Sequence, residues 1–271
     1  MSSAQATPVP NQESKRIRSV SELFELLEAA HEEFYTGELW WRGQPRYWPL
    51  TPAVHRIADR GHFESGVVIR FMGQARSRYP DCPPKSDLAA WLFLMQHHGL
   101  PTRLLDWTAS ALVALFFAVS DRQHDSSDGV LFVINPSALN NTAIQYNGTI
   151  PTDRLDAFTR HVLDPNAESP YPPTTVALAA DESTARAVSQ QGRFTIHGAP
   201  GPLDEHPDRA AFLRRFSVDA ASKPAIRKAL GRVGFQKHRL FPDLDSLAEW
   251  ASGLCFCGLS PCPHTDSNEQ G

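Results

Sequence analysis

Residues 96–108 read Gln96-His97-His98-Gly99-Leu100-Pro101-Thr102-Arg103-Leu104-Leu105-Asp106-Trp107-Thr108 and separate two strongly apolar segments. The apolar segments, 88–95 and 109–121, have the length and composition of buried helices. We expect the run between them to be a loop that both helices hold rigidly at a cleft. Because it combines two histidines, an arginine and an aspartate, the run is a candidate functional site.

Within this run, burial decides what each side chain needs. An aspartate between two apolar helices requires partners, so we expect Asp106 to accept hydrogen bonds from Arg103 or from nearby backbone. Thr108 is expected to support the same corner. His97 and His98 are the candidate reactive side chains, and the alternative is that one of them caps the C-terminus of the preceding helix.

A second segment with chemistry is Trp41-Arg42-Gly43-Gln44, at the end of a short aromatic strand predicted over 39–43. An arginine on a rigid strand presents a planar fork that suits phosphate or carboxylate, and Gly43 would let a ligand approach the backbone. The alternative is structural: Arg42 stacks on Trp41 or pairs with a buried acid.

Working outward, the sequence predicts one mixed domain of the α+β class over 19–252, with a small mixed sheet packed against apolar helices. Residues 1–18 are expected to be a disordered leader, residues 136–180 mostly long loops, and 253–271 a polar tail. Strands are predicted at 39–43, 129–135, 193–197 and 212–218. Helices are predicted from the Ser19 cap to Gly37, at 63–79, from the Ser86 cap to Gly99, at 109–121, near 155–162, at 181–190, from the Ser222 cap to Gly234, and from Asp243 to 251.

Composition bounds the function. The chain has 271 residues and a formal net charge of -4, which argues against binding nucleic acid by bulk charge. The N-terminus has no apolar segment typical of a signal peptide, and the longest apolar run, 109–119, is too short to cross a bilayer. We therefore expect a cytoplasmic protein with reduced thiols and no membrane partner.

Three of the four cysteines lie in the tail, where Cys255, Cys257, Cys262 and His264 could close a tetrahedral zinc site. Because four protein ligands leave no open position, such a zinc would be structural. The alternative is a disordered tail with free thiols.

The two chemistry-bearing segments resemble the FRG-domain family, which is named for an aromatic-Arg-Gly motif. The motif is Trp41-Arg42-Gly43-Gln44 here, and the resemblance extends over about 20–251 through Trp48-Pro49-Leu50-Thr51-Pro52, the run 96–108, Gln190-Gln191-Gly192-Arg193-Phe194-Thr195, and Leu240-Phe241-Pro242-Asp243-Leu244-Asp245.

The order of elements in the family is similar to that of ADP-ribosyltransferases, which implies NAD as the cofactor. By this resemblance Arg42, with Gly43, Gln44 and Arg103, would bind the pyrophosphate. His97 or His98 would order the nicotinamide ribose, and Gln190 or Gln191 would provide the late polar residue. The reaction releases nicotinamide through an oxocarbenium-like state, which requires positioning and charge stabilisation.

Three functions remain open at this point. The first is an ADP-ribosyltransferase-like toxin or anti-phage effector that modifies a protein or nucleic acid and is controlled by an antitoxin or other regulatory partner. The second is a hydrolase or nuclease that uses His97, His98 and Asp106, with or without a metal. The third is a non-catalytic sensor module in which Arg42 and Arg103 clamp an anion.

Overall fold

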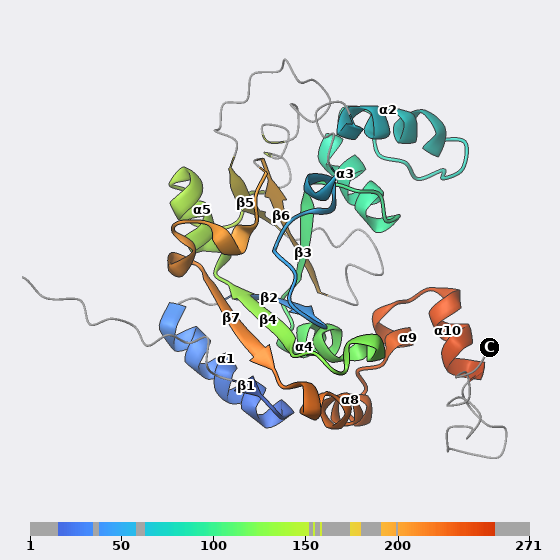
Figure 1. Cartoon of the computed structure of the whole chain (residues 1–271). Helices are drawn as coiled ribbons and strands as arrows, with labels where there is room; N and C mark the ends of the chain where they lie inside the picture. Colours follow the sequence, from blue (N-terminus) through green and yellow to red (C-terminus); the bar gives the residue numbers. More distant parts are fainter. Residues whose placement is uncertain are drawn as a thin grey trace, which may run out of the picture.

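The computed structural model describes residues 16–34, 38–57, 63–151, 154, 158, 174–179, 191–198 and 200–252. In this part of the chain seven strands form one sheet in the order β1-β7-β4-β2-β3-β6-β5, with helices around it (Figure 1). The β1–β7 pair is parallel and the other pairs are antiparallel, which confirms the predicted α+β class. The strands are β1 (Arg16–Ile17), β2 (Trp40–Gln44), β3 (Leu104–Thr108), β4 (Gly129–Ile134), β5 (Thr175–Leu178), β6 (Gly192–His197) and β7 (Leu213–Val218).

The helices begin where the sequence offers caps. Ser19 and Glu22 start α1 as predicted, since the Ser19 hydroxyl accepts from the Glu22 N–H. Asp87, not Ser86, caps α3 by accepting from Ala90 N–H at 3.0 Å. The helices are α1 (Val20–Phe34), α2 (Phe63–Ala75), α3 (Leu88–His97), α4 (Ala111–Ser120), α5 (Pro136–Ile144), α8 (Lys223–Arg232), α9 (Lys237–Leu240) and α10 (Leu244–Ser252).

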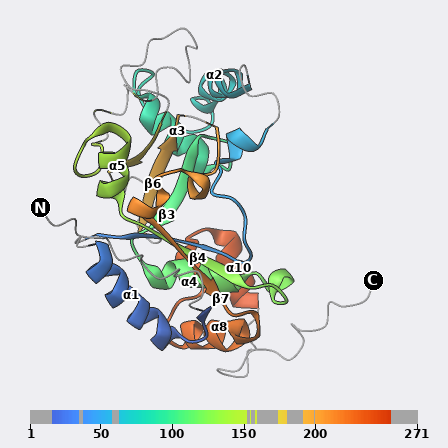
Figure 2. The same ribbon diagram turned by 60° about the vertical axis from the view of Figure 1, so that its left-hand side comes forward.

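The two faces of the sheet are covered differently. One face, here called the helical face, carries two hydrophobic cores: α1, α4 and α8 cover β2, β4 and β7, whereas α2 and α3 cover β3, β5 and β6. The opposite face, here called the loop face, packs Trp40, Trp107 and Phe132 against Leu50 and Leu203 from connecting segments, with Leu139 of α5 alongside. In Figure 1 the two groups of strands lie in the lower and upper halves of the molecule, and Figure 2 shows α1 and α8 together under the lower group.

The sheet opens between β2 and β3. These strands share one paired position, Trp41 opposite Thr108, whereas β2 and β4 pair over five positions and β3 and β6 over five. The centre of the sheet is therefore where its two halves meet through the fewest backbone hydrogen bonds.

Gly43 sets how closely α4 approaches the helical face. A Cβ built at Gly43 would meet the backbone oxygen of Ala114 at 1.7 Å and the nitrogen of Ala118 at 2.9 Å. The expectation that Gly43 leaves room for a ligand is therefore corrected: the space beside this glycine is filled by a helix backbone.

A buried asparagine joins α5 to the edge strand β5. The Asn140 side chain accepts from Ala177 N–H at 2.7 Å and donates to the Ala177 carbonyl at 2.9 Å and to the Gly148 carbonyl at 2.7 Å. Both backbone groups of Ala177 are thus satisfied on the side away from β6.

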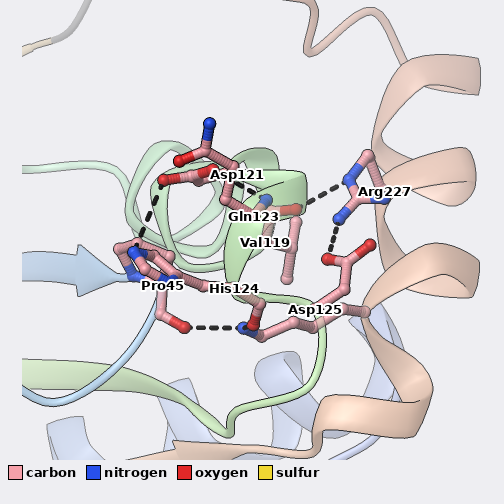
Figure 3. Close-up of polar contacts among 8 residues, drawn as sticks. Pro45, Val119, Asp121, Gln123, His124, Asp125 and Arg227 are labelled. Atoms are coloured by element: carbon pink, nitrogen blue, oxygen red, sulfur yellow. Dashed lines mark hydrogen bonds and ion pairs between the residues drawn. The ribbon is translucent and has the colours of Figure 1, made fainter. Parts of the chain in front are cut away.

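The end of β2 is tied to α8 through a buried lysine. The Lys223 ammonium donates to the carbonyls of Pro45 and His124 at 2.6 and 2.7 Å. Beside it, Arg227 donates to the Val119 carbonyl at 2.7 Å and to the Asp125 carboxylate at 2.5 Å (Figure 3). The Lys223–Pro45 contact fixes the start of the segment 45–57, from which Leu50 packs on the loop face.

Several predicted boundaries are corrected. Residues 104–108 form a strand, not a loop, because β6 offers a complete antiparallel partner. Residues 136–144, predicted as loop, form α5, since Asn135 caps a helix with Pro136 in its first turn and Asn140 bonds to β5. Arg16 and Ile17, placed in the disordered leader by the sequence, pair with β7 as β1. The helix predicted at 181–190 lies outside the described residues, and so does most of the one near 155–162.

Candidate anion-binding site around Arg42

Arg42 lies at the opening between β2 and β3. Its Nη1 donates to the backbone carbonyl of Asp106 at 2.6 Å, which replaces a hydrogen bond that the separated strands do not make. Its Nε–H is buried and has no hydrogen-bond partner in the described part of the chain. A buried unsatisfied donor costs about 1–3 kcal/mol, so this nitrogen is a ready position for an acceptor.

The charge of Arg42 is balanced by no ion pair among the described residues and is only partly compensated, by the Asp106 carboxylate. Burial lowers the pKa of Arg42 from its usual value, Asp106 opposes that shift, and the positive charge of Arg56 adds to it. A half-buried cation whose nearest charges include a second cation favours an incoming anion.

Asp106 is exposed and organises its neighbours through hydrogen bonds. Its Oδ2 accepts from Gln96 Nε2 at 2.8 Å, and the Gln96 Oε1 accepts from the Thr102 hydroxyl. The Thr102 hydroxyl in turn accepts from Leu104 N–H at 3.2 Å. The last turn of α3 is thereby bonded to β3 directly at Asp106 and through Thr102 at Leu104, next to the carbonyl that Arg42 binds.

The sequence predicted that Asp106 accepts hydrogen bonds from Arg103 or from nearby backbone, but Arg103 does not pair with Asp106. It forms a two-bond ion pair with Glu64 of α2, with nitrogen–oxygen distances of 3.0 and 2.5 Å. Both side chains are buried, and a buried arginine requires a carboxylate in this geometry. Asp106 is exposed on β3 and has no such need.

His97 and His98 lie at the C-terminal end of α3, and both are exposed. Their rings meet edge to face at 5.1 Å, and His98 lies 6.3 Å from the ring of Phe71 in α2. His98 is the C-cap of α3, as one of the predicted alternatives had it. Neither ring is bonded to Arg42.

The remaining predicted site residues are spread over the sheet. Gln44 is buried, and its side-chain oxygen accepts from Trp48 N–H at 3.0 Å. The Thr108 hydroxyl accepts from Ser110 N–H at 3.0 Å and so supports the start of α4. Gln191 is exposed at positive φ, and its carbonyl accepts from Ala109 N–H beyond the far end of β3. Gln190 lies outside the described residues.

The loop face contains a buried polar chain that the motifs did not reveal. Trp107 Nε1 donates to the Thr195 hydroxyl at 3.0 Å, and that hydroxyl lies 3.0 Å from His197 Nε2. His55 Nε2 donates to the His197 carbonyl at 3.1 Å. Burial lowers the pKa of His197 to about 3, helped by the charges of His55, Arg42 and Arg103.

The sequence contains a weak indication of this buried chain of hydrogen bonds. Thr195 and His197 alternate with apolar residues in Arg193-Phe194-Thr195-Ile196-His197, which places them on one face of the predicted strand. Nothing local shows that this face meets Trp107 and His55, because both contacts join residues far apart in the sequence.

The predicted zinc ligands Cys255, Cys257, Cys262 and His264 lie outside the described residues, so the zinc site stays a prediction. Within the described residues no group of three or more His, Cys, Asp or Glu side chains is arranged to hold a metal ion. None of the helices in that same part of the chain has the length and apolar character needed to cross a lipid bilayer.

Comparison with known proteins gives one match. Residues 37–127 match the family model of the FRG domain, a segment that runs from just before β2 to just past α4 and includes both Arg42 and the run 96–108. Residues 37–127 therefore belong to an FRG domain. No curated protein and no solved structure matches the chain.

Proposed function

We propose that the FRG domain binds the pyrophosphate of NAD through Arg42 and uses it in an ADP-ribosyltransferase-like reaction. The observation that carries the proposal is the state of Arg42: a half-buried guanidinium on a central strand with no ion pair and an unused Nε–H. A diphosphate offers acceptor oxygens and negative charge at the same point.

The fit to NAD depends on how Arg42 is held. Its contact with the Asp106 carbonyl orients the fork, and the chain Asp106-Gln96-Thr102 holds that carbonyl in place. Preorganised donors of this kind bind developing or fixed negative charge without further reorganisation. NAD would supply the ADP-ribosyl group that is transferred, with nicotinamide as the leaving group.

A second candidate is a non-catalytic module that senses the same class of ligand. It is favoured by the separation of the residues proposed for catalysis: His97 and His98 are exposed beside α2, and Gln191 lies beyond the far end of β3. A sensor requires Arg42 and no reactive group beside it.

Titration calorimetry on the full chain tests the proposal. Wild-type protein should bind NAD and ADP-ribose but not adenosine, and Arg42→Lys should weaken binding about tenfold or more because lysine loses the fork. The control is Arg232→Lys, at an exposed arginine on α8. If NAD does not bind, or if Arg42→Lys binds it like wild type, the proposal fails.

Nicotinamide release separates the two candidates. Protein that binds NAD and releases nicotinamide when incubated with cell extract is an enzyme. Binding with no release in the presence of extract and added nucleic acid favours the sensor.

A further inference from the structure

Arg42 and His197 project from the same face of the sheet, on either side of β3. In the antiparallel register Trp41 stands opposite Thr108, so Arg42 shares a face with Trp107. Trp107 stands opposite Arg193, and Thr195 and His197 follow on that face of β6. The two residues therefore lie on one face of the sheet with β3 between them, and the positive charge of Arg42 is one of the causes that lower the pKa of His197.

The hydrogen-bond chain determines which nitrogen of His197 carries the proton. Thr195 is buried, and its oxygen already accepts from Trp107 Nε1. The hydroxyl hydrogen then has one acceptor among the described residues, His197 Nε2. This arrangement, which satisfies the hydroxyl hydrogen, favours the neutral tautomer of His197 with its proton on Nδ1.

That Nδ1–H is buried and has no hydrogen-bond partner among the described residues. Arg42 Nε–H is in the same state. Trp40 Nε1–H, two residues from Arg42 on the same face of β2, is a third such donor. Unsatisfied donors on one face, beside a cation with no ion pair, form a site that lacks acceptor oxygens and negative charge.

We infer that His197 is a second ligand-binding residue, whose Nδ1–H donates to the far phosphoryl group of a pyrophosphate held by Arg42. The inference rests on the proposed function, which assigns the near phosphoryl group to Arg42.

The register explains why a pyrophosphate fits better than a single phosphate. Arg42 stands level with Trp107, whereas His197 stands level with Arg103, farther along β3. The two donors are thus offset along the strand as well as across it, and an anion must extend to reach both. Phosphoryl oxygens accept hydrogen bonds and donate none, as two facing N–H groups require.

His197 lies deeper than Arg42. His197 and Thr195 are fully buried, and His55 donates to the His197 carbonyl, while Arg42 is partly exposed. The ligand would enter beside Arg42 and place its second phosphoryl group inward.

The test uses two variants of His197 that each keep one N–H donor, at the position of Nδ1 in the first variant and of Nε2 in the second. In His197→Asn the side-chain amide nitrogen can take the position of Nδ1, and in His197→Gln it takes that of Nε2. Calorimetry with pyrophosphate and with ADP-ribose should find His197→Asn within about threefold of wild type and His197→Gln weaker by about tenfold or more. Orthophosphate should bind wild type more weakly than pyrophosphate does.

Nitrogen-15 spectra of wild-type histidine side chains provide a second readout that does not depend on how the variants fold. They should show His197 protonated at Nδ1 and should show that signal move when pyrophosphate is added. A proton on Nε2, or an Nδ1 signal that pyrophosphate leaves unchanged, would overturn the inference and indicate a buried water as the partner.

Arg42→Gln, measured in parallel, separates the two proposals. Suppose that wild type binds pyrophosphate, that Arg42→Gln abolishes this binding, and that His197→Gln binds like wild type. In that case Arg42 keeps its role in binding and His197 has none. If wild type binds neither NAD nor pyrophosphate, the proposed function fails and takes the role of His197 with it.

Discussion

Gly43 lies directly beneath the carbonyl oxygen of Ala114, so that strand β2 and helix α4 touch backbone to backbone. This contact determines the distance between the motif strand and the helix that follows the run 96–108. It explains the glycine of the motif by packing, whereas Arg42 beside it lies on the loop face, level with Phe132.

Replacing Gly43 with alanine should therefore destabilise the protein by about 3 kcal/mol or more, because a methyl group has no room without moving a helix backbone. Denaturant unfolding measures the change. Gly66→Ala is the matched control: nothing lies within 4 Å of the added methyl group on α2, so that variant should gain up to about 1 kcal/mol. Equal stability of the two variants would contradict the packing seen here.

The Glu64–Arg103 ion pair predicts a different pattern. Glu64→Leu leaves the buried Arg103 charge without its carboxylate and should cost about 3–5 kcal/mol. The double variant Glu64→Leu/Arg103→Met should recover most of that loss and should still bind pyrophosphate like wild type. If the double variant folds and loses the ligand, Arg103 belongs to the anion site after all.

Asp106 predicts a gain in affinity. Asp106→Asn removes a negative charge near Arg42 and keeps an oxygen that can accept from Gln96. Pyrophosphate should bind about threefold tighter at low salt, and the gain should fade as salt screens the exposed charge. Weaker binding would show that the carboxylate itself contacts the ligand.

His197 predicts a pH dependence of stability. Its pKa is about 3 when folded, below the usual 6.5, so between these values the unfolded state binds the additional proton. Stability from this group is complete above pH 6.5 and is lost as pH falls, by about 1.4 kcal/mol per unit. His197→Asn should flatten the stability curve between pH 6 and pH 4 relative to wild type. Parallel curves for the two proteins would contradict the burial of a neutral His197.

Much of the fold follows from local patterns. The Ser19–Glu22 cap, the apolar helices α3 and α4, and the β-branched strand β4 are each specified by their own residues. β3 was not predicted because four of its five residues are buried, on both faces of the sheet, and Asp106 alone is exposed. Its sequence therefore lacks the alternation of apolar and polar residues that indicates a strand. α5 was missed because Asn140, unfavourable in an isolated helix, is stabilised there by β5, nearly forty residues later.

The candidate site likewise contains residues that the local sequence indicates and contacts that it does not. Arg42 is indicated by its aromatic strand and its glycine. The partner of Arg103 could not be predicted, because Glu64 lies 39 residues earlier on a helix whose docking is a property of the whole fold. The tautomer of His197 likewise depends on Trp107, 88 residues from Thr195. Short motifs identify which residues carry chemistry, and long-range packing determines their partners.

The asparagine that joins α5 to β5 also bears on how copies of this protein behave at high concentration. Edge strands recruit other strands when their outward N–H and C=O groups are open. At β5 the outward groups of Ala177 are taken by Asn140 and Ile150, and β1 at the opposite edge has two residues in the part of the chain that the structure describes. In the described part of the chain neither border therefore gives a neighbouring chain a long template for strand-by-strand polymerisation. Asn140→Leu would unmask the amide of Ala177 as a seed for it, while Ile150 would still occupy the carbonyl.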